Sequence, residues 1–86
     1  MKLSITLNQT QAVLEITKNG LPLDSKKLSY YHDLDVKLIT SIDNLLRKNM
    51  IDISSINSYK IQGNLGINST SYTIAQAVVE ALKLRT

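Results

Sequence analysis

A strand that leads through a glycine-containing corner straight into a helix constrains the fold of this chain more than any other feature. The strand is expected over Ile56–Gln62 and the helix over Ser71–Leu84. The corner between them, Gly63–Thr70, is rich in Gly, Asn, Ser and Thr. A strand that is followed so closely by a helix predicts an α/β domain.

The chain before this passage predicts three further strands. Apolar and polar residues alternate over Lys2–Leu7 and continue over Gln11–Lys18, which is the pattern of half-buried strands. The Asn-Gly pair at positions 19 and 20 indicates a tight hairpin, because a type I′ turn needs a positive φ at both central residues. The third strand is expected over Leu21–Ser29, with Pro22 at its start or on a sheet edge.

Two helices complete the order β-β-β-α-β-α. The first is expected over Tyr31–Asn49, where leucine and isoleucine recur at steps of four and three. The second is apolar almost all the way round, so we expect it to bury two faces, one on the sheet and one on a partner. Its two stripes are Ile74, Val78 and Ala81 on one side and Ala75, Val79 and Leu82 on the other. The residues expected at the interface are Leu38, Ile42, Leu45, Ala75, Val78, Val79 and Leu82.

Composition favours a single domain over residues 1–86 and argues against several functions. The ten basic and seven acidic residues are scattered, and Trp and Phe are absent, so we expect no direct nucleic-acid binding. Zero cysteines exclude a thiolate metal site and a cysteine nucleophile. No apolar run approaches a membrane span of about 20 residues, and the first residues do not resemble a signal peptide. A cytoplasmic protein is therefore expected.

The element order, the passages DISSINSYKIQG and GINSTSYTIAQAVVEAL, and His32 at the start of the long helix resemble the N-terminal half of the TsaB (YeaZ) family. The resemblance covers nearly the whole chain but only the first of the family's two lobes. It implies a half-lobe of the actin/Hsp70-like, RNase H-like (ASKHA) fold, with an antiparallel meander, a fourth strand parallel to the first, and both helices on one face. It also implies a non-catalytic partner of TsaD in the threonylcarbamoyladenosine modification of tRNA.

The chain departs from the family pattern where chemistry would be expected. A DTAT-like segment is replaced by Leu7-Asn8-Gln9-Thr10, in which only Thr10 remains, and the corner lacks the family's Phe and Arg. We therefore expect no enzymatic activity and no cofactor. The expected role is association with a second copy, with a TsaD-like protein, or with both. A degenerate homologue with no function beyond folding is a further alternative.

A small module that binds nucleotide or phosphate at the corner is the other alternative. Backbone N–H groups before a helix can hold phosphate, but no lysine follows the glycines as in a Walker motif. A structural corner is favoured. The corner residues that could contact such a ligand are Gly63, Asn64, Gly66, Asn68, Ser69 and Thr70. His32, next to Asp33 and near Asp35, is expected to pack locally rather than bind metal, because successive helix positions do not converge.

Overall fold

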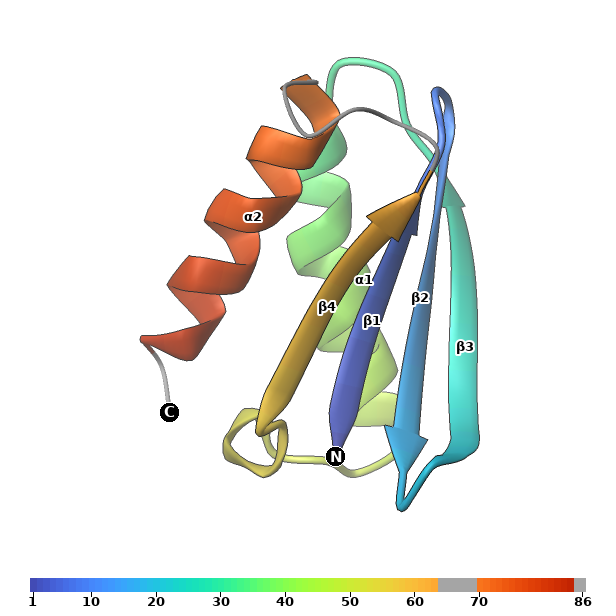
Figure 1. The fold of residues 1–86 in the computed structure, drawn as a ribbon, viewed down its shortest axis with the longest axis vertical. Coiled ribbons are helices and arrows are strands. Elements are labelled where there is room, and N and C mark those ends of the chain that lie inside the picture. Colours follow the sequence, from blue (N-terminus) through green and yellow to red (C-terminus); the bar gives the residue numbers. More distant parts are fainter. Residues whose placement is uncertain (64–69, 85–86) are drawn as a thin grey trace.

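Two helices cover one face of a four-stranded sheet (Figure 1). The computed structural model describes residues 1–63 and 70–84. The elements are β1 (Lys2–Leu7), β2 (Gln11–Lys18), β3 (Leu21–Ser29), α1 (Leu34–Lys48), the short 3₁₀ helix η1 (Ile53–Ser55), β4 (Ser58–Gly63) and α2 (Thr70–Lys83). The strands lie in the order β3-β2-β1-β4, and β1 is antiparallel to β2 and parallel to β4. The expected meander, extended by a strand parallel to the first, is confirmed.

The start of α1 differs from the expectation. The helix begins at Leu34 rather than at Tyr31. The carboxylate of Asp33 accepts a hydrogen bond from the backbone N–H of Tyr31 at 3.2 Å. Both residues precede the helix. Asp33 makes no side-chain capping bond to the helix that follows it. Tyr31 and His32 therefore precede the helix and do not form its first turn.

The elements around the corner also begin at different residues. The fourth strand starts at Ser58 rather than at Ile56. Ile56 instead donates its N–H to the oxygen of Ile53 at 3.0 Å and closes η1, which lies between the expected helix and the expected fourth strand. The second helix starts at Thr70, one residue before the expected Ser71.

The core lies between the helices and one face of the sheet. Alternation along β1 buries Leu3, Ile5 and Leu7 on this face, while Ser4 and Thr6 stay half-exposed on the other. The strands and helices bury the following apolar residues together: Leu3, Ile5, Leu7, Ala12, Leu14, Ile16, Leu28, Tyr30, Leu34, Leu38, Ile42, Leu45, Leu46, Ile56, Ala75, Val78, Val79 and Leu82. No helix covers the opposite face of the sheet in the part of the chain that the structure describes.

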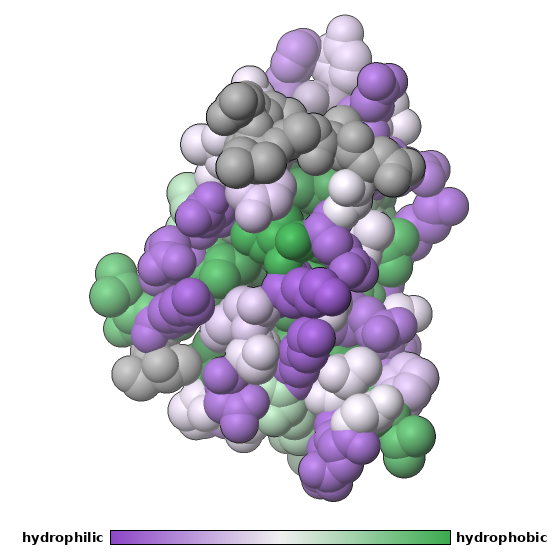
Figure 2. Space-filling model, viewed as in Figure 1, coloured by the Kyte–Doolittle hydropathy of each residue, from purple (hydrophilic) through white to green (hydrophobic). Residues whose placement is uncertain are grey.

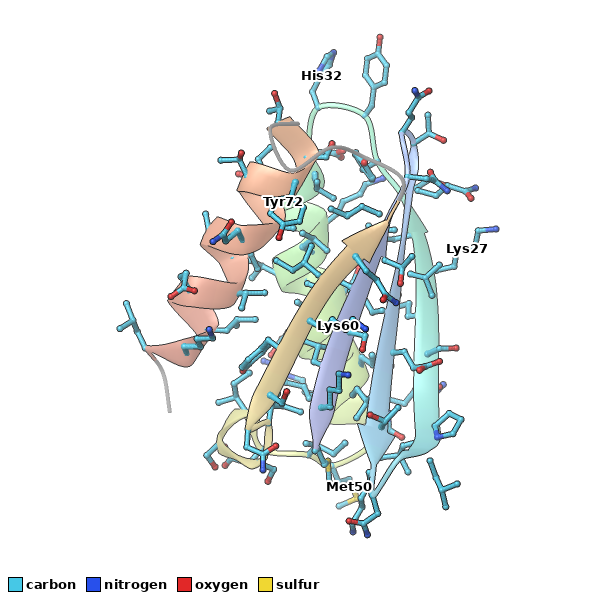
Figure 3. All side chains as sticks on the ribbon, in the orientation of Figure 1. Lys27, His32, Met50, Lys60 and Tyr72 are labelled. Carbon is cyan, nitrogen blue, oxygen red and sulfur yellow. The ribbon has the colours of Figure 1, made fainter. Side chains whose placement is uncertain are left out.

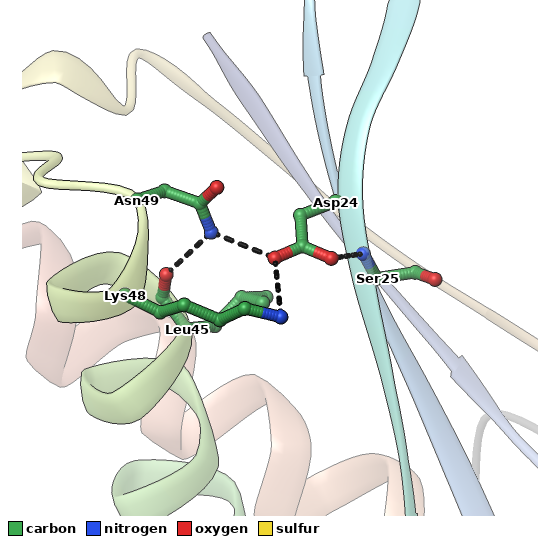
Figure 4. Close-up of polar contacts among 5 residues, drawn as sticks. All are labelled: Asp24, Ser25, Leu45, Lys48 and Asn49. Atoms are coloured by element: carbon green, nitrogen blue, oxygen red, sulfur yellow. Dashed lines mark hydrogen bonds and ion pairs between the residues drawn. The ribbon is translucent and has the colours of Figure 1, made fainter.

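A polar cluster ties the end of α1 to β3 (Figure 4). One carboxylate oxygen of Asp24 accepts a hydrogen bond from the Asn49 amide at 2.9 Å and lies 3.4 Å from the Lys48 ammonium. The other accepts the Ser25 N–H at 2.8 Å. The hydrogen bond from Asn49, followed by that from Ser25, holds the pKa of Asp24 below its usual value. The cluster thus fixes α1 against the sheet edge opposite β4.

The last turn of α1 ends on a residue in the left-handed conformation. Met50 has a φ of 56° and donates its N–H to the oxygen of Arg47, while Ile51 donates to that of Leu46. This is the Schellman pattern, in which glycine is the preferred residue. We expect Met50→Gly to raise the free energy of unfolding by about 0.5–1 kcal/mol, because the Met50 side chain is almost fully exposed and only the φ penalty is relieved. Urea denaturation followed by circular dichroism measures the change. Met50→Ala is the control, and equal stability of the two variants would contradict the prediction.

Candidate functional site

The glycine that ends β4 has a structural task. Gly63 pairs in register with Leu7 of β1 and has a φ of +148°. A Cβ atom at this position would lie 2.0 Å from the backbone oxygen of Leu7. Glycine is therefore needed here for the close approach of two strands, whether or not the corner binds a ligand.

Of the other corner residues expected to contact a ligand, Thr70 alone lies within the described part of the chain. Thr70 is the exposed first residue of α2. The remaining expected ligand contacts, Asn64, Gly66, Asn68 and Ser69, lie outside the described residues. The described geometry therefore explains the need for Gly63 and leaves phosphate binding a prediction.

A buried tyrosine joins three segments near the corner. The Tyr30 hydroxyl donates to the backbone oxygen of Asn8 at 2.5 Å and lies 3.1 Å from the Ser71 hydroxyl. The Asn8 side chain in turn accepts the N–H groups of Thr10 and Gln11. Thr10 thus contributes its backbone to a tight turn. These polar groups hold β1, β3 and α2 together at this end of the sheet.

The single histidine lies close to Tyr31 and is exposed. The ring centroids of His32 and Tyr31 are 4.1 Å apart, in an edge-to-face arrangement. Asp33 bonds to the Tyr31 N–H and lies 3.8 Å from Lys37, and the first of these contacts lowers the pKa of its carboxyl most. Within residues 1–63 and 70–84, no three His, Cys, Asp or Glu side chains come together as metal ligands would. The local packing expected for His32 agrees with this placement.

The residues expected at an interface are buried inside the chain. Each has an exposed fraction of 5% or less. They are Leu38, Ile42, Leu45, Ala75, Val78, Val79 and Leu82. The division of α2 into a sheet stripe and a partner stripe is wrong, because Val78 and Val79 are both buried whereas Ala81 is exposed. A partner that binds the protein in this conformation would contact exposed side chains and not these seven buried ones.

A hollow of about 170 Å³, lined by six apolar residues with a charged pair at its rim, lies where α1, α2 and the connection after α1 meet. Ile39, Ile51 and Ile53 line it and are partly or largely accessible. Two of the buried residues expected at the interface, Ile42 and Leu82, reach its wall. The hollow is completed by Leu46, Asp43 and Arg47.

Sequence reasoning missed most of the hollow. Ile39 follows the buried Leu38 on α1, and its position at the flank of the apolar stripe could have been read from the helical period. Ile51 and Ile53 lie in the short connection between the expected helix Tyr31–Asn49 and the expected strand Ile56–Gln62. Two isoleucines in a short polar connection were the available signal, because a loop seldom needs large apolar residues unless they are covered.

The open face of the sheet forms a polar trough of about 560 Å³. Its lysines are Lys2 on β1 and Lys60 on β4, and its only acidic residue is Glu15 on β2. The trough also contains Met1, Ser4, Thr17, Asn19, Gly20, Asn57 and Gln62. The alternation along each strand did not predict the trough, because its lining depends on which polar side chains of neighbouring strands lie together on the open face.

Two further findings concern the whole of the described chain. Neither α1 nor α2 has the length and hydrophobicity that crossing a membrane would require. No protein-family model matches the sequence, and a search of curated proteins found no match.

Proposed function

We propose that this chain is a non-catalytic, TsaB-like interaction domain that associates with a second copy through the outer flank of its helices. The observation that carries the proposal is Ile39, which is 43% exposed on α1 and lines the hollow between the helices. Val36, one turn earlier on the same helix, is 60% exposed. Ile39 lines the hollow and Val36 is accessible one turn away on the same helix, and such exposed apolar side chains favour a protein contact.

Charge at the rim of the hollow favours a second copy as the partner. Asp43 and Arg47 lie one turn apart on α1, and their side chains are 3.2 Å apart. A two-fold interface places the same surface on both partners, so residue i of one copy meets residue j of the other. Two antiparallel α1 helices could therefore exchange these partners, with Arg47 of each copy facing Asp43 of the other.

The arrangement of elements supports the finer fold assignment within this proposal. The order β3-β2-β1-β4, with both helices on one face, agrees with the half-lobe that the resemblance implies. We propose that the chain is such a half-lobe, related to actin/Hsp70-like domains. In this reading it would support tRNA threonylcarbamoyladenosine modification indirectly, through a TsaD-like partner on the same helix flank.

Sedimentation velocity tests the proposal on the purified protein. We expect a dimer at about 100 μM, in the range where weak interfaces are populated. Ile39→Asp should raise the dissociation constant of the dimer at least about tenfold, because it places a carboxylate in an apolar contact. Thr40→Asp, on the next residue of α1, introduces the same charge about 100° around the helix and should have a smaller effect.

The outcomes separate the partner from the surface. If the wild-type protein were a monomer at this concentration, the proposed self-association would be wrong. If a TsaD-like protein then bound the wild type but not Ile39→Asp, the helix flank would still be a binding surface, but for a different partner. If neither association depended on Ile39, the proposed function would be wrong.

A further inference from the structure

The two edges of the sheet are built differently. At the β3 edge, Pro22 cannot donate to a ladder, and the pairing of β2 with β3 shifts register between Ile16 and Thr17. Such irregularities discourage another strand from pairing. β4 instead pairs with β1 in unbroken register from Ser58 to Gly63 and contains no proline. Of the two edges, β4 is the one suited to accept a further strand.

The outer side of β4 has no strand beside it in the described part of the chain. Every second N–H and C=O of an edge strand points away from its sheet, so these groups on β4 have no ladder partner there. Tyr59 and Ile61 lie on the core face and remain partly accessible, whereas Lys60 lies on the open face. In Figure 2, hydrophobic side chains reach the surface near the centre of the view, between α2 and β4.

A buried hydroxyl at this edge also has no partner. The Tyr59 hydroxyl is shielded from solvent and makes no hydrogen bond within residues 1–63 and 70–84. A buried polar group without a partner costs free energy, and native structures contain few of them. A polar group of another segment that reached this hydroxyl would recover that cost.

The charge of the sheet indicates the chemistry of that segment. The four strands carry five basic and two acidic residues, whereas the rest of the chain carries five of each. The basic residues of the described helices are ion-paired: Lys37, Arg47, Lys48 and Lys83. By contrast, Lys2 and Lys60 form no ion pair with the described residues. A strand added beside β4 would direct every second side chain toward this unpaired positive charge.

We propose that the β4 edge binds one extended acidic segment of a partner protein, which adds to the sheet as a fifth strand. Its apolar side chains would continue the row of Tyr59 and Ile61, and its carboxylates would lie beside Lys60 on the open face. No strand of this chain alternates apolar and acidic residues, because Glu15 and Asp24 are the only acids among them. A second copy therefore does not supply the segment, and the surface is separate from the helix flank around Ile39.

The probe for this test is a capped eight-residue peptide that alternates valine and glutamate, titrated into ¹⁵N-labelled protein. We expect amide shifts confined to β4 and its neighbour β1, together with slower exchange of β4 amides that point outward. Lys60→Glu should weaken binding at least about fivefold, as expected for reversing a charge at the rim of a contact. Lys27→Glu is the matched control, because Lys27 lies on the same open face at the opposite edge (Figure 3).

Two further peptides test the geometry of the contact. One is N-methylated at its valines and the other at its glutamates, so each lacks the donors of one strand edge. Strand addition uses one edge only, so we expect one methylated peptide to bind as the parent does and the other to lose binding. Equal binding of both peptides would overturn the proposal, as would equal effects of the two lysine variants. Shifts centred on Ile39 instead of β4 would overturn it too.

Discussion

Replacing Gly63 by alanine is expected to unfold much of the protein. The new Cβ would lie 2.0 Å from the Leu7 oxygen, and backbone on both strands would have to move. Position 63 also has a φ of +148°, which residues with a side chain rarely adopt. We expect a loss of at least about 3 kcal/mol, a large part of the stability of a domain this small. Urea denaturation followed by circular dichroism measures the loss.

Gly20 provides the matched control. It also has a positive φ, of 80°, but a Cβ there would meet nothing within 4 Å. Gly20→Ala should therefore cost only the conformational penalty, about 1 kcal/mol. If Gly63→Ala cost no more than Gly20→Ala, the close approach of β4 to β1 at Leu7 would be wrong.

An aspartate at position 79 is expected to prevent folding. Val79 is 4% exposed in the core, where a carboxylate would be left without a partner or solvent. Burying such a charge costs several kcal/mol, so Val79→Asp should lose at least about 4 kcal/mol of unfolding free energy. The dispersion of a ¹H–¹⁵N NMR spectrum distinguishes a folded from an unfolded variant.

Ala81→Asp tests the same helix on its exposed side. The same carboxylate would stay in water there, so we expect a loss of about 0.5–1 kcal/mol from helix propensity alone. A well-dispersed spectrum for Val79→Asp would contradict the burial of this residue. Unfolding of Ala81→Asp would show that the opposite side of α2 is also part of the core.

The first three strands could be predicted from the sequence because their signals are local. Alternation of apolar and polar residues defined β1 and β2. The Asn-Gly hairpin between β2 and β3 is confirmed by positive φ values of 56° at Asn19 and 80° at Gly20. Each of these features depends on neighbours within a few residues, so no tertiary contact was needed to infer it.

The covered faces of α2 could not be predicted from hydrophobicity alone. Alanine raises the apolar content of a helix, but it favours a helix wherever it stands, buried or exposed. Ala75 is fully buried, whereas Ala77 and Ala81 are exposed. Once the exposed alanines are set aside, the buried residues of α2 form one stripe. Counting Ala77 and Ala81 as apolar therefore predicted a second buried face, although both residues are exposed to solvent.

The candidate surfaces were hidden from the sequence for a different reason. The trough and the β4 edge exist because β4 lies beside β1. This pairing was part of the expected strand order, but the alternation along each strand does not show which polar side chains then gather on the open face. The hollow beside Ile39 likewise needs the connection after α1 to return against α2. Sequence periodicity reports which side of an element is apolar, but it does not report which distant element lies next to it.

The pairing of β1 with β4 has a consequence for the order of folding. Contacts between these strands, such as that of Gln62 with Thr6, join residues 56 positions apart. Closing so long a loop costs more chain entropy than forming the two hairpin pairings of the meander. The meander can therefore form before β4 and α2 pack against it. We expect β4 and α2 to be the first elements to detach when the protein is partly denatured. A partner strand on β4 would then act as a clamp on the last-formed part of the domain.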